Sequence, residues 1–253
     1  MSYVELKHLL ADLALDAIGD PARVSRVAVA AACAREASRG SDGSAPALTR
    51  GECLTRAAVL AAPLGSRPEP RDIGHLERAG LLEGDVDVVR LAARFAPYYE
   101  YAERQLSRLL DALAALRREA GSGGTEQAVR VAAILFNAGL FFECHEWTEA
   151  LWKKETGASR ELFHGLVQVA AAFYHHEKGN HHGRRALLAR GRGRLASYPA
   201  TYLGLELERF RKELAAWAEH FDGGPRPAAF PRLTSAPNTK GSSAGVTGLR
   251  WRG

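Results

Sequence analysis

The sequence predicts an all-α protein: a small helical bundle preceded by a second helical unit and followed by a disordered C-terminal tail. Three observations lead to this prediction. Apolar residues recur at helical spacing along most of the chain, helix-start signals precede several of these runs, and no strand-like alternation is long enough to predict a sheet. With 253 residues, 46% of them apolar, the chain can bury a core without disulfides or a structural metal.

Two low-complexity breaks divide the chain into three predicted parts. Residues 120–124 have the composition of a flexible linker, and the Gly-, Pro- and Ser-rich stretch from Asp222 onward can bury little apolar surface. We therefore expect a helical unit without an assigned function at 1–120, a helical bundle at 125–221 and a disordered tail at 222–253.

Helix-start signals define most elements of the first unit. Asp20 followed by Pro21 is typical of an N-cap before a first helical proline, and Thr49 with Glu52 has the spacing of a capping box. After the leucine-rich stretch at the N-terminus, helices are expected at 24–39, 54–64, 72–79 and 87–116, the last interrupted near Pro97.

Residues 75–82 allow two interpretations. A helix that ends in Gly-Leu-Leu often precedes the hairpin of a winged-helix domain, and Gly80, Leu81 and Leu82 fit that pattern. A helix stopped by a glycine C-cap explains the same residues. We favour the C-cap, because a glycine is the ordinary way to end a helix.

The net charge of +5 and the pI of about 9.3 bear on partners and location. This charge is small for the length and spread along the chain, so it supports a nucleic-acid partner only weakly. No run approaches the roughly 20 apolar residues of a membrane span. We expect no secretory signal, because the first residues do not form a basic segment followed by an apolar one. Three widely spaced cysteines fit a reducing cytoplasm. A homo-oligomer is compatible with all of these features.

The segment 136–180 carries most of the polar chemistry. It reads as two helices joined by a short loop, which should pack as antiparallel neighbours. Polar side chains at helical spacing mark one face of each predicted helix. These are His145 and Glu149 on the first helix, and His164, Gln168 and His175 on the second. We expect Glu149 level with His164, and His145 level with Gln168.

Three hypotheses account for polar groups buried between two helices, since such groups must satisfy one another or bind something. The first is a structural hydrogen-bond network. The second is a divalent-metal site, with His145, Glu149, His164 and His175 as candidate ligands. The third is acid–base chemistry, with His145 or His175 as the base and Glu146 or Glu149 orienting it. A di-iron site is disfavoured, because Glu161 and His164 form the only Glu-x-x-His motif of this segment.

Three motifs stand out in and just after this segment. The first is Phe-Glu-Cys-His-Glu at 142–146, followed by Glu149 and Trp152. The second comprises Gly165, Val167-Gln168, Tyr174-His175 and Gly179-Asn180. The third comprises Gly183, Leu187-Leu188, Arg190-Gly191 and Tyr198-Pro199. With these motifs the chain resembles a known family, domain of unknown function 309, over about residues 130–200.

The resemblance implies a small helical bundle with a shared polar cluster, and it supplies no activity. The cluster consists of Glu143, His145, Glu146, Glu149, Gln168 and His175, to which we add Asn180. Thr148 stands where the family usually has Leu, so local packing should differ there. We predict a non-catalytic binding or interaction module that uses this cluster structurally. The alternative is a divalent-metal-binding, hydrolytic domain built on the same residues.

Overall fold

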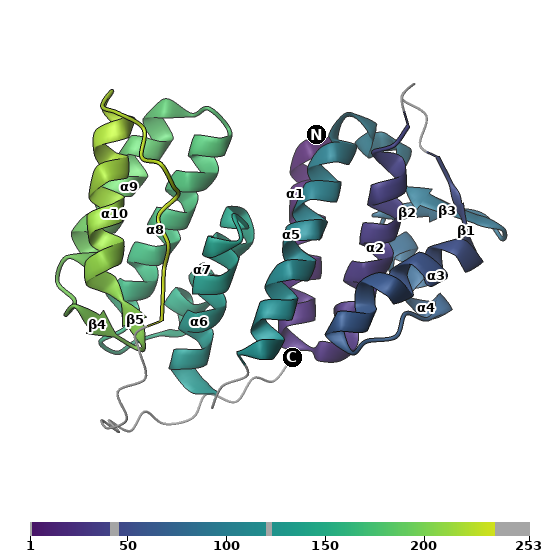
Figure 1. Ribbon diagram of the computed structural model, residues 1–253, viewed down its shortest axis with the longest axis horizontal. Coiled ribbons are helices and arrows are strands. Elements are labelled where there is room, and N and C mark those ends of the chain that lie inside the picture. The colour runs from purple at the N-terminus through teal and green to yellow at the C-terminus, as the bar shows by residue number, and fades with distance from the viewer. Residues whose placement is uncertain (1, 41–45, 120–122, 236–253) are drawn as a thin grey trace. The chain divides into compact units, whose positions relative to one another are not determined.

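The computed structural model describes residues 2–40, 46–119 and 123–235 (Figure 1). The predicted helical class is confirmed, since most of these residues lie in helices. The chain divides into two compact units, Met1–Glu119 and Ala120–Gly253, and each is described by itself. Within the described ranges, no helix has the length and apolar character needed to cross a membrane.

The first unit is built around one almost fully buried helix. That helix, α2 (Val24–Ala37), consists largely of Ala and Val, so its faces can be approached closely by its neighbours. It packs against the four other α-helices of the unit. These are α1 (Ser2–Gly19), α3 (Arg50–Ala61), α4 (Pro70–Arg78) and α5 (Tyr99–Arg118). Short 3-10 helices occupy Pro21–Arg23, Ala62–Leu64 and Ala93–Tyr98.

The predicted helix starts are confirmed at two positions. The carboxylate of Asp20 accepts a hydrogen bond from the Ala22 amide at 3.0 Å. Thr49 and Glu52 form a reciprocal capping box at the start of α3. A second capping box, between Glu69 and Asp72, begins α4.

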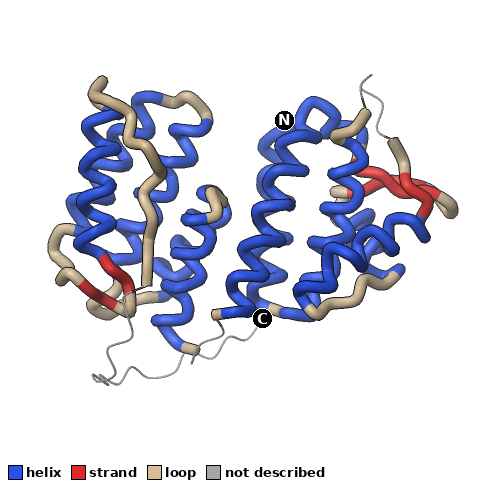
Figure 2. The backbone as a smooth tube through the Cα atoms, in the orientation of Figure 1, coloured by secondary structure: helices blue, strands red, loops and turns tan. Residues whose placement is uncertain are grey.

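A three-stranded antiparallel sheet accompanies the helices of the first unit, where the sequence predicted no strand (Figure 2). It contains β1 (Leu48–Thr49), β2 (Leu82–Gly84) and β3 (Val88–Leu91), in the order β1-β3-β2. The helix expected at 87–116 is therefore wrong in its first third: a strand and a 3-10 turn precede α5, which begins at Tyr99. Strands of two to four residues are too short to produce a detectable alternation.

The order of elements from α2 to β3 is that of a winged-helix domain. A helix, a strand, two further helices and a β-hairpin follow one another, and the first strand pairs with the last. Gly80 follows α4 with φ of 77°, so the expected glycine stop is present as well. The hairpin that comes next supports the winged-helix interpretation, which the sequence alone did not favour.

The second unit is a bundle of five helices around α8. The helices are α6 (Gly124–Asn137), α7 (Phe141–Lys154), α8 (Arg160–Glu177), α9 (His181–Leu195) and α10 (Leu207–Phe221). A two-stranded hairpin of β4 (Thr201–Tyr202) and β5 (Leu205–Glu206) joins the last two. Phe136, Phe173, Phe210 and Trp217 meet in the core, mostly edge to face.

Helices α8 and α9 approach each other closely because both present glycine at the contact. A Cβ on Gly191 would lie 2.8 Å from Cγ2 of Val169 and 3.0 Å from the Gly165 carbonyl oxygen. A Cβ on Gly165 would lie 3.0 Å from the Leu195 side chain. These two glycines therefore set the separation of α8 and α9.

The expectation of a disordered tail from residue 222 is corrected for residues 222–235. Asn137 exchanges two hydrogen bonds with the Leu233 backbone, at 2.8 and 2.9 Å. Phe230 stacks on Trp217 with 4.8 Å between ring centroids, and Leu233 is buried. A few apolar side chains thus suffice to attach this segment, although its Gly and Pro content indicated otherwise. Residues 236–253 of the predicted tail lie outside the described residues.

Candidate functional site

The predicted polar cluster lies along the antiparallel pair α7 and α8. Nδ1 of His145 is 3.4 Å from the carbonyl oxygen of Val167, one residue before Gln168. His145 therefore lies beside the turn of α8 that contains Gln168, the residue with which it was expected to be level. His164 instead lies level with Trp152, and the two rings stack with centroids 4.2 Å apart.

Arg194 of α9 organises the polar contacts on α8. Its guanidinium pairs with Glu161, and its Nε donates to Oε1 of Gln168 at 3.2 Å. The Gln168 amide nitrogen in turn lies 3.2 Å from Nε2 of His164. This chain fixes the amide orientation, since its oxygen must face the guanidinium. Within this chain, Arg194 contacts both Glu161 and Gln168, and Gln168 contacts both Arg194 and His164.

Burial and the nearby Arg194 charge lower the pKa of His164. The ring is therefore neutral at pH 7, and its Nε2 accepts the hydrogen bond from the Gln168 amide. The Trp152 ring covers one face of the imidazole, and the Arg160 guanidinium lies 5.2 Å from the centroid of that indole. These contacts hold His164 in place without an external ligand.

The remaining cluster residues form separate local contacts. Glu149 bonds to Lys153 at 2.8 Å, and this hydrogen bond lowers the pKa of the carboxyl group. Asn180 caps α9 by accepting from the Gly183 amide, and its nitrogen lies 3.0 Å from Nδ1 of His175.

Two further acidic residues of the cluster differ sharply in exposure. Glu143 is buried in the first turn of α7, with 1% of its surface exposed. Glu146 is half-buried, and its carboxylate lies 3.9 Å from Nε2 of His145, beyond hydrogen-bond distance. The acid–base hypothesis therefore lacks an orienting hydrogen bond between these two side chains.

The candidate metal ligands do not converge. Across the described ranges, no group of three or more His, Cys, Asp or Glu side chains is arranged to hold a metal ion. His145, Glu149, His164 and His175 each contact a different local partner. These four residues therefore do not form one shared set of ligands, whereas a zinc site has three or four protein ligands around one ion.

Thr148, where the family usually has Leu, faces the core and is fully buried. Its hydroxyl donates to the Cys144 carbonyl at 2.7 Å. This back-bond satisfies the polar atom within its own helix, so a threonine is accommodated at an apolar position.

Sequence reasoning missed the role of Arg194. Arg185 and Arg190 on the same helix are exposed, whereas the Arg194 side chain is 33% exposed and contacts α8. No local pattern identifies Arg194, because its partner Gln168 is 26 residues away. Its position one turn beyond Gly191, where α8 and α9 touch, is the only available signal.

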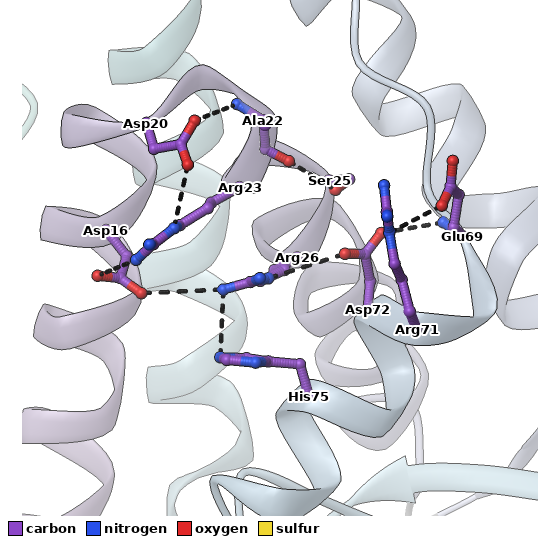
Figure 3. Close-up of polar contacts among 10 residues, drawn as sticks. All are labelled: Asp16, Asp20, Ala22, Arg23, Ser25, Arg26, Glu69, Arg71, Asp72 and His75. Carbon is purple, nitrogen blue, oxygen red and sulfur yellow. Dashed lines mark hydrogen bonds and ion pairs between the residues drawn. The ribbon is translucent and has the colours of Figure 1, made fainter.

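A second arginine-centred network lies in the first unit and was also missed (Figure 3). Arg26 of α2 lies between Asp16 of α1 and Asp72 of α4, with nitrogen–oxygen distances of 3.9 and 3.8 Å. Its Nη1 is 3.2 Å from Nε2 of His75. Asp72 also accepts a hydrogen bond from the Glu69 amide at 2.9 Å, which caps α4. Arg26 therefore joins three helices.

Partial burial, followed by the Arg26 charge, lowers the pKa of His75. A neutral His75 accepts the hydrogen bond that the arginine donates. The network fixes α4, the helix that a winged-helix domain uses for recognition, against the core of the unit.

Comparison with known proteins bears on the second unit. Residues 129–187 match the model of a family described as Domain of unknown function (DUF309). Uncharacterized protein YpuF of Bacillus subtilis (strain 168) is 40% identical over 50 residues, which are 19% of this chain. The matched stretch spans 29% of the length of that relative. No solved structure gives a significant match. The hairpin α7–α8, with the adjoining parts of α6 and α9, is therefore the part of the chain that is similar to the DUF309 family, the family that its motifs resemble.

Proposed function

We propose that this protein is a non-catalytic binding protein, in which the polar cluster of the DUF309 segment sets the geometry of α7, α8 and α9. One observation carries the proposal: the chain from Glu161 through Arg194 and Gln168 to His164 is closed within the bundle. A closed network specifies the register of packed helices and requires no ligand. Three free cysteines support a reducing cytoplasm as the proposed location.

The test compares metal content and stability in tag-free protein. We expect no stoichiometric metal by elemental mass spectrometry in the wild type or in a His145→Ala, Glu149→Ala double variant. Gln168→Ala, which interrupts the network, should lower the melting temperature and again leave metal content unchanged. Near-stoichiometric metal in the wild type that is lost from the double variant would replace this proposal with the metal-binding alternative.

A second candidate function, duplex nucleic-acid binding, is favoured by the winged-helix order of elements. The exposed side of α4 carries Arg71 and Arg78, and Arg67 precedes the helix. The β2–β3 hairpin argues against nucleic-acid binding, because its Glu83, Asp85 and Asp87 side chains would repel phosphates. The first unit also has 16 Lys and Arg against 17 Asp and Glu, so its net charge offers no attraction.

Fluorescence anisotropy with a random-sequence DNA duplex at low salt tests whether the first unit binds nucleic acid through α4. If α4 binds DNA, Arg71→Ala and Arg78→Ala should each weaken binding and reduce its salt dependence. Arg104→Ala, an exposed position on α5, serves as the matched control. Equal weakening by all three variants, or no binding at all, would leave a protein as the partner class for this unit.

A further inference from the structure

Two of the three cysteines lie side by side in the core of the first unit. Sγ of Cys33 on α2 is 3.5 Å from Sγ of Cys53 on α3. Both residues are free thiols with no exposed surface. The helices that carry them pack directly against each other, so the pair joins two of the three helices of the winged-helix arrangement.

The two thiols differ in the direction in which their pKa is shifted. The hydrogen bond that the two thiols share, together with burial, raises the pKa of the Cys33 thiol well above its usual range. The same hydrogen bond lowers the pKa of Cys53, and the Arg50 and Arg56 charges act in the same direction against the opposing effect of burial. Cys53 is thus the better nucleophile of the pair, since the thiolate is the reactive form.

We propose that Cys33 and Cys53 are a redox modification site, at which a hydroperoxide converts the two thiols into a reversible intramolecular disulfide. The Cys53 thiolate attacks the peroxide oxygen, which gives a sulfenic acid and releases the other oxygen as hydroxide. The Cys33 sulfur, losing its proton to that hydroxide, then attacks the Cys53 sulfur and displaces its oxygen as a second hydroxide. The proton first lost from Cys53 neutralises that hydroxide. Two thiols and one hydrogen peroxide therefore become one disulfide and two waters, with two electrons transferred.

The geometry favours a bond within the chain. A disulfide has a length of about 2.05 Å, so the sulfurs must approach by roughly 1.5 Å from their present separation. Because both thiols are buried, a second protein molecule cannot reach them, whereas a small peroxide enters through local opening of α3. A thiol reductant reverses the modification by the same opening.

Cys144 in the second unit provides a matched internal control. It is as deeply buried as the pair, and burial raises the pKa of its thiol. Its Sγ donates to the Ala132 carbonyl at 3.4 Å rather than to another sulfur. Burial without a neighbouring thiol should leave Cys144 reduced.

The experiment oxidises the full, tag-free, reduced chain with hydrogen peroxide, then quenches, denatures, alkylates and maps tryptic peptides without reductant. We expect a linked species of peptides 27–35 and 51–56, two hydrogens lighter than their sum, with Cys144 alkylated. Dithiothreitol should restore both thiols. Oxidation of Cys144 at the same or a lower dose, with Cys33 and Cys53 still alkylated, would overturn the proposal.

Trapping with dimedone tests the order of attack and the partner. In Cys33→Ser the adduct should form on Cys53, and Cys53→Ser should give little adduct on Cys33. Mixing isotopically heavy and light chains before oxidation should give only linked peptides of a single isotope. Mixed heavy–light peptides would overturn the intramolecular bond, and a dominant adduct on Cys33 would overturn the assignment of Cys53 as nucleophile.

Discussion

Each unit of this protein contains an arginine that links packed helices, yet the two arginines use different partners: Arg26 joins α1, α2 and α4, whereas Arg194 joins α8 and α9. Arg26 lies between two carboxylates, those of Asp16 and Asp72, and also contacts His75. Arg194 pairs with one carboxylate, that of Glu161, and passes a hydrogen bond through Gln168 to His164. The imidazole at the end of each network has a lowered pKa, because burial and the arginine both disfavour its charge.

The Arg26 network balances opposite charges, whereas the Arg194 network is a chain of hydrogen bonds that ends in neutral groups. In the first unit a buried carboxylate balances a largely buried cation, so losing either partner leaves an uncompensated charge. In the second unit the carboxylate is half exposed, and the neutral amide and imidazole transmit geometry rather than charge. We therefore expect the first network to be more sensitive to the removal of one side chain.

The largest effect is expected for Asp72→Ala. The change removes the buried one of the two carboxylates that contact Arg26, and with it one half of the capping box of α4, so the free energy of unfolding should fall by about 3 kcal/mol. No tryptophan precedes residue 120, and Trp147, Trp152 and Trp217 lie in helices of the second unit, so tryptophan fluorescence follows the unfolding of that unit. Urea unfolding should show an early far-UV circular dichroism transition, with an unchanged fluorescence midpoint.

Asp12→Ala is the control for that experiment, since Asp12 is exposed on α1. It should change the circular dichroism midpoint by less than about 0.5 kcal/mol. A loss below about 1 kcal/mol for Asp72→Ala would show that Arg26 does not depend on this carboxylate.

Arg194→Ala should cost about 2 kcal/mol in the second unit, because it leaves the Gln168 amide oxygen buried without a donor. Fluorescence is the direct measurement here, since Trp152 stacks on His164. Arg190→Ala on the same helix is the exposed control. If both variants unfold at the same urea concentration, the relay does not contribute to stability.

Acidification should weaken both networks by protonating their histidines. The folded pKa of His75 and His164 lies below the unfolded value of about 6.5, so their stabilising contribution is complete above that pH and falls as the pH decreases. The second unit should lose more, since burial and the Arg184, His220, Arg226 and His181 charges lower the pKa of His176 to about 4.

The measurement is the melting temperature of each unit between pH 7 and pH 5. The fluorescence transition should shift further than the circular dichroism transition of the first unit. His176→Gln should remove most of that difference. An unchanged slope in this variant would assign the pH dependence to other groups.

The smallest effect is expected for Glu149→Gln. Its carboxylate pairs with Lys153 one turn away on the helix surface, a contact typically worth about 0.3–0.5 kcal/mol. A chemical unfolding curve should therefore nearly superimpose on that of the wild type. A loss above about 1.5 kcal/mol would indicate that Glu149 takes part in the polar network of α7 and α8.

Local signals predicted most helices, and long-range contacts determined what was missed. The caps at Asp20 and Thr49 are visible because their partners lie within three residues. The spacing of His164 and Gln168 predicted a shared face for the same reason. Arg26 and His75 are 49 residues apart, so no periodic pattern connects them. The winged-helix hairpin was considered and not favoured, because β2 and β3 contain only three and four residues and leave no detectable alternation.

The attachment of residues 225–235 to the bundle has a practical consequence for dissecting the protein. A fragment ended at Phe221, where the last helix stops, would remove the Phe230 ring from Trp217 and leave Asn137 without its two backbone partners. Such a fragment would expose an aromatic surface and tend to self-associate in expression trials. Any isolated version of the second unit should therefore extend through Ser235, whose bridge to Leu205 completes the sheet edge.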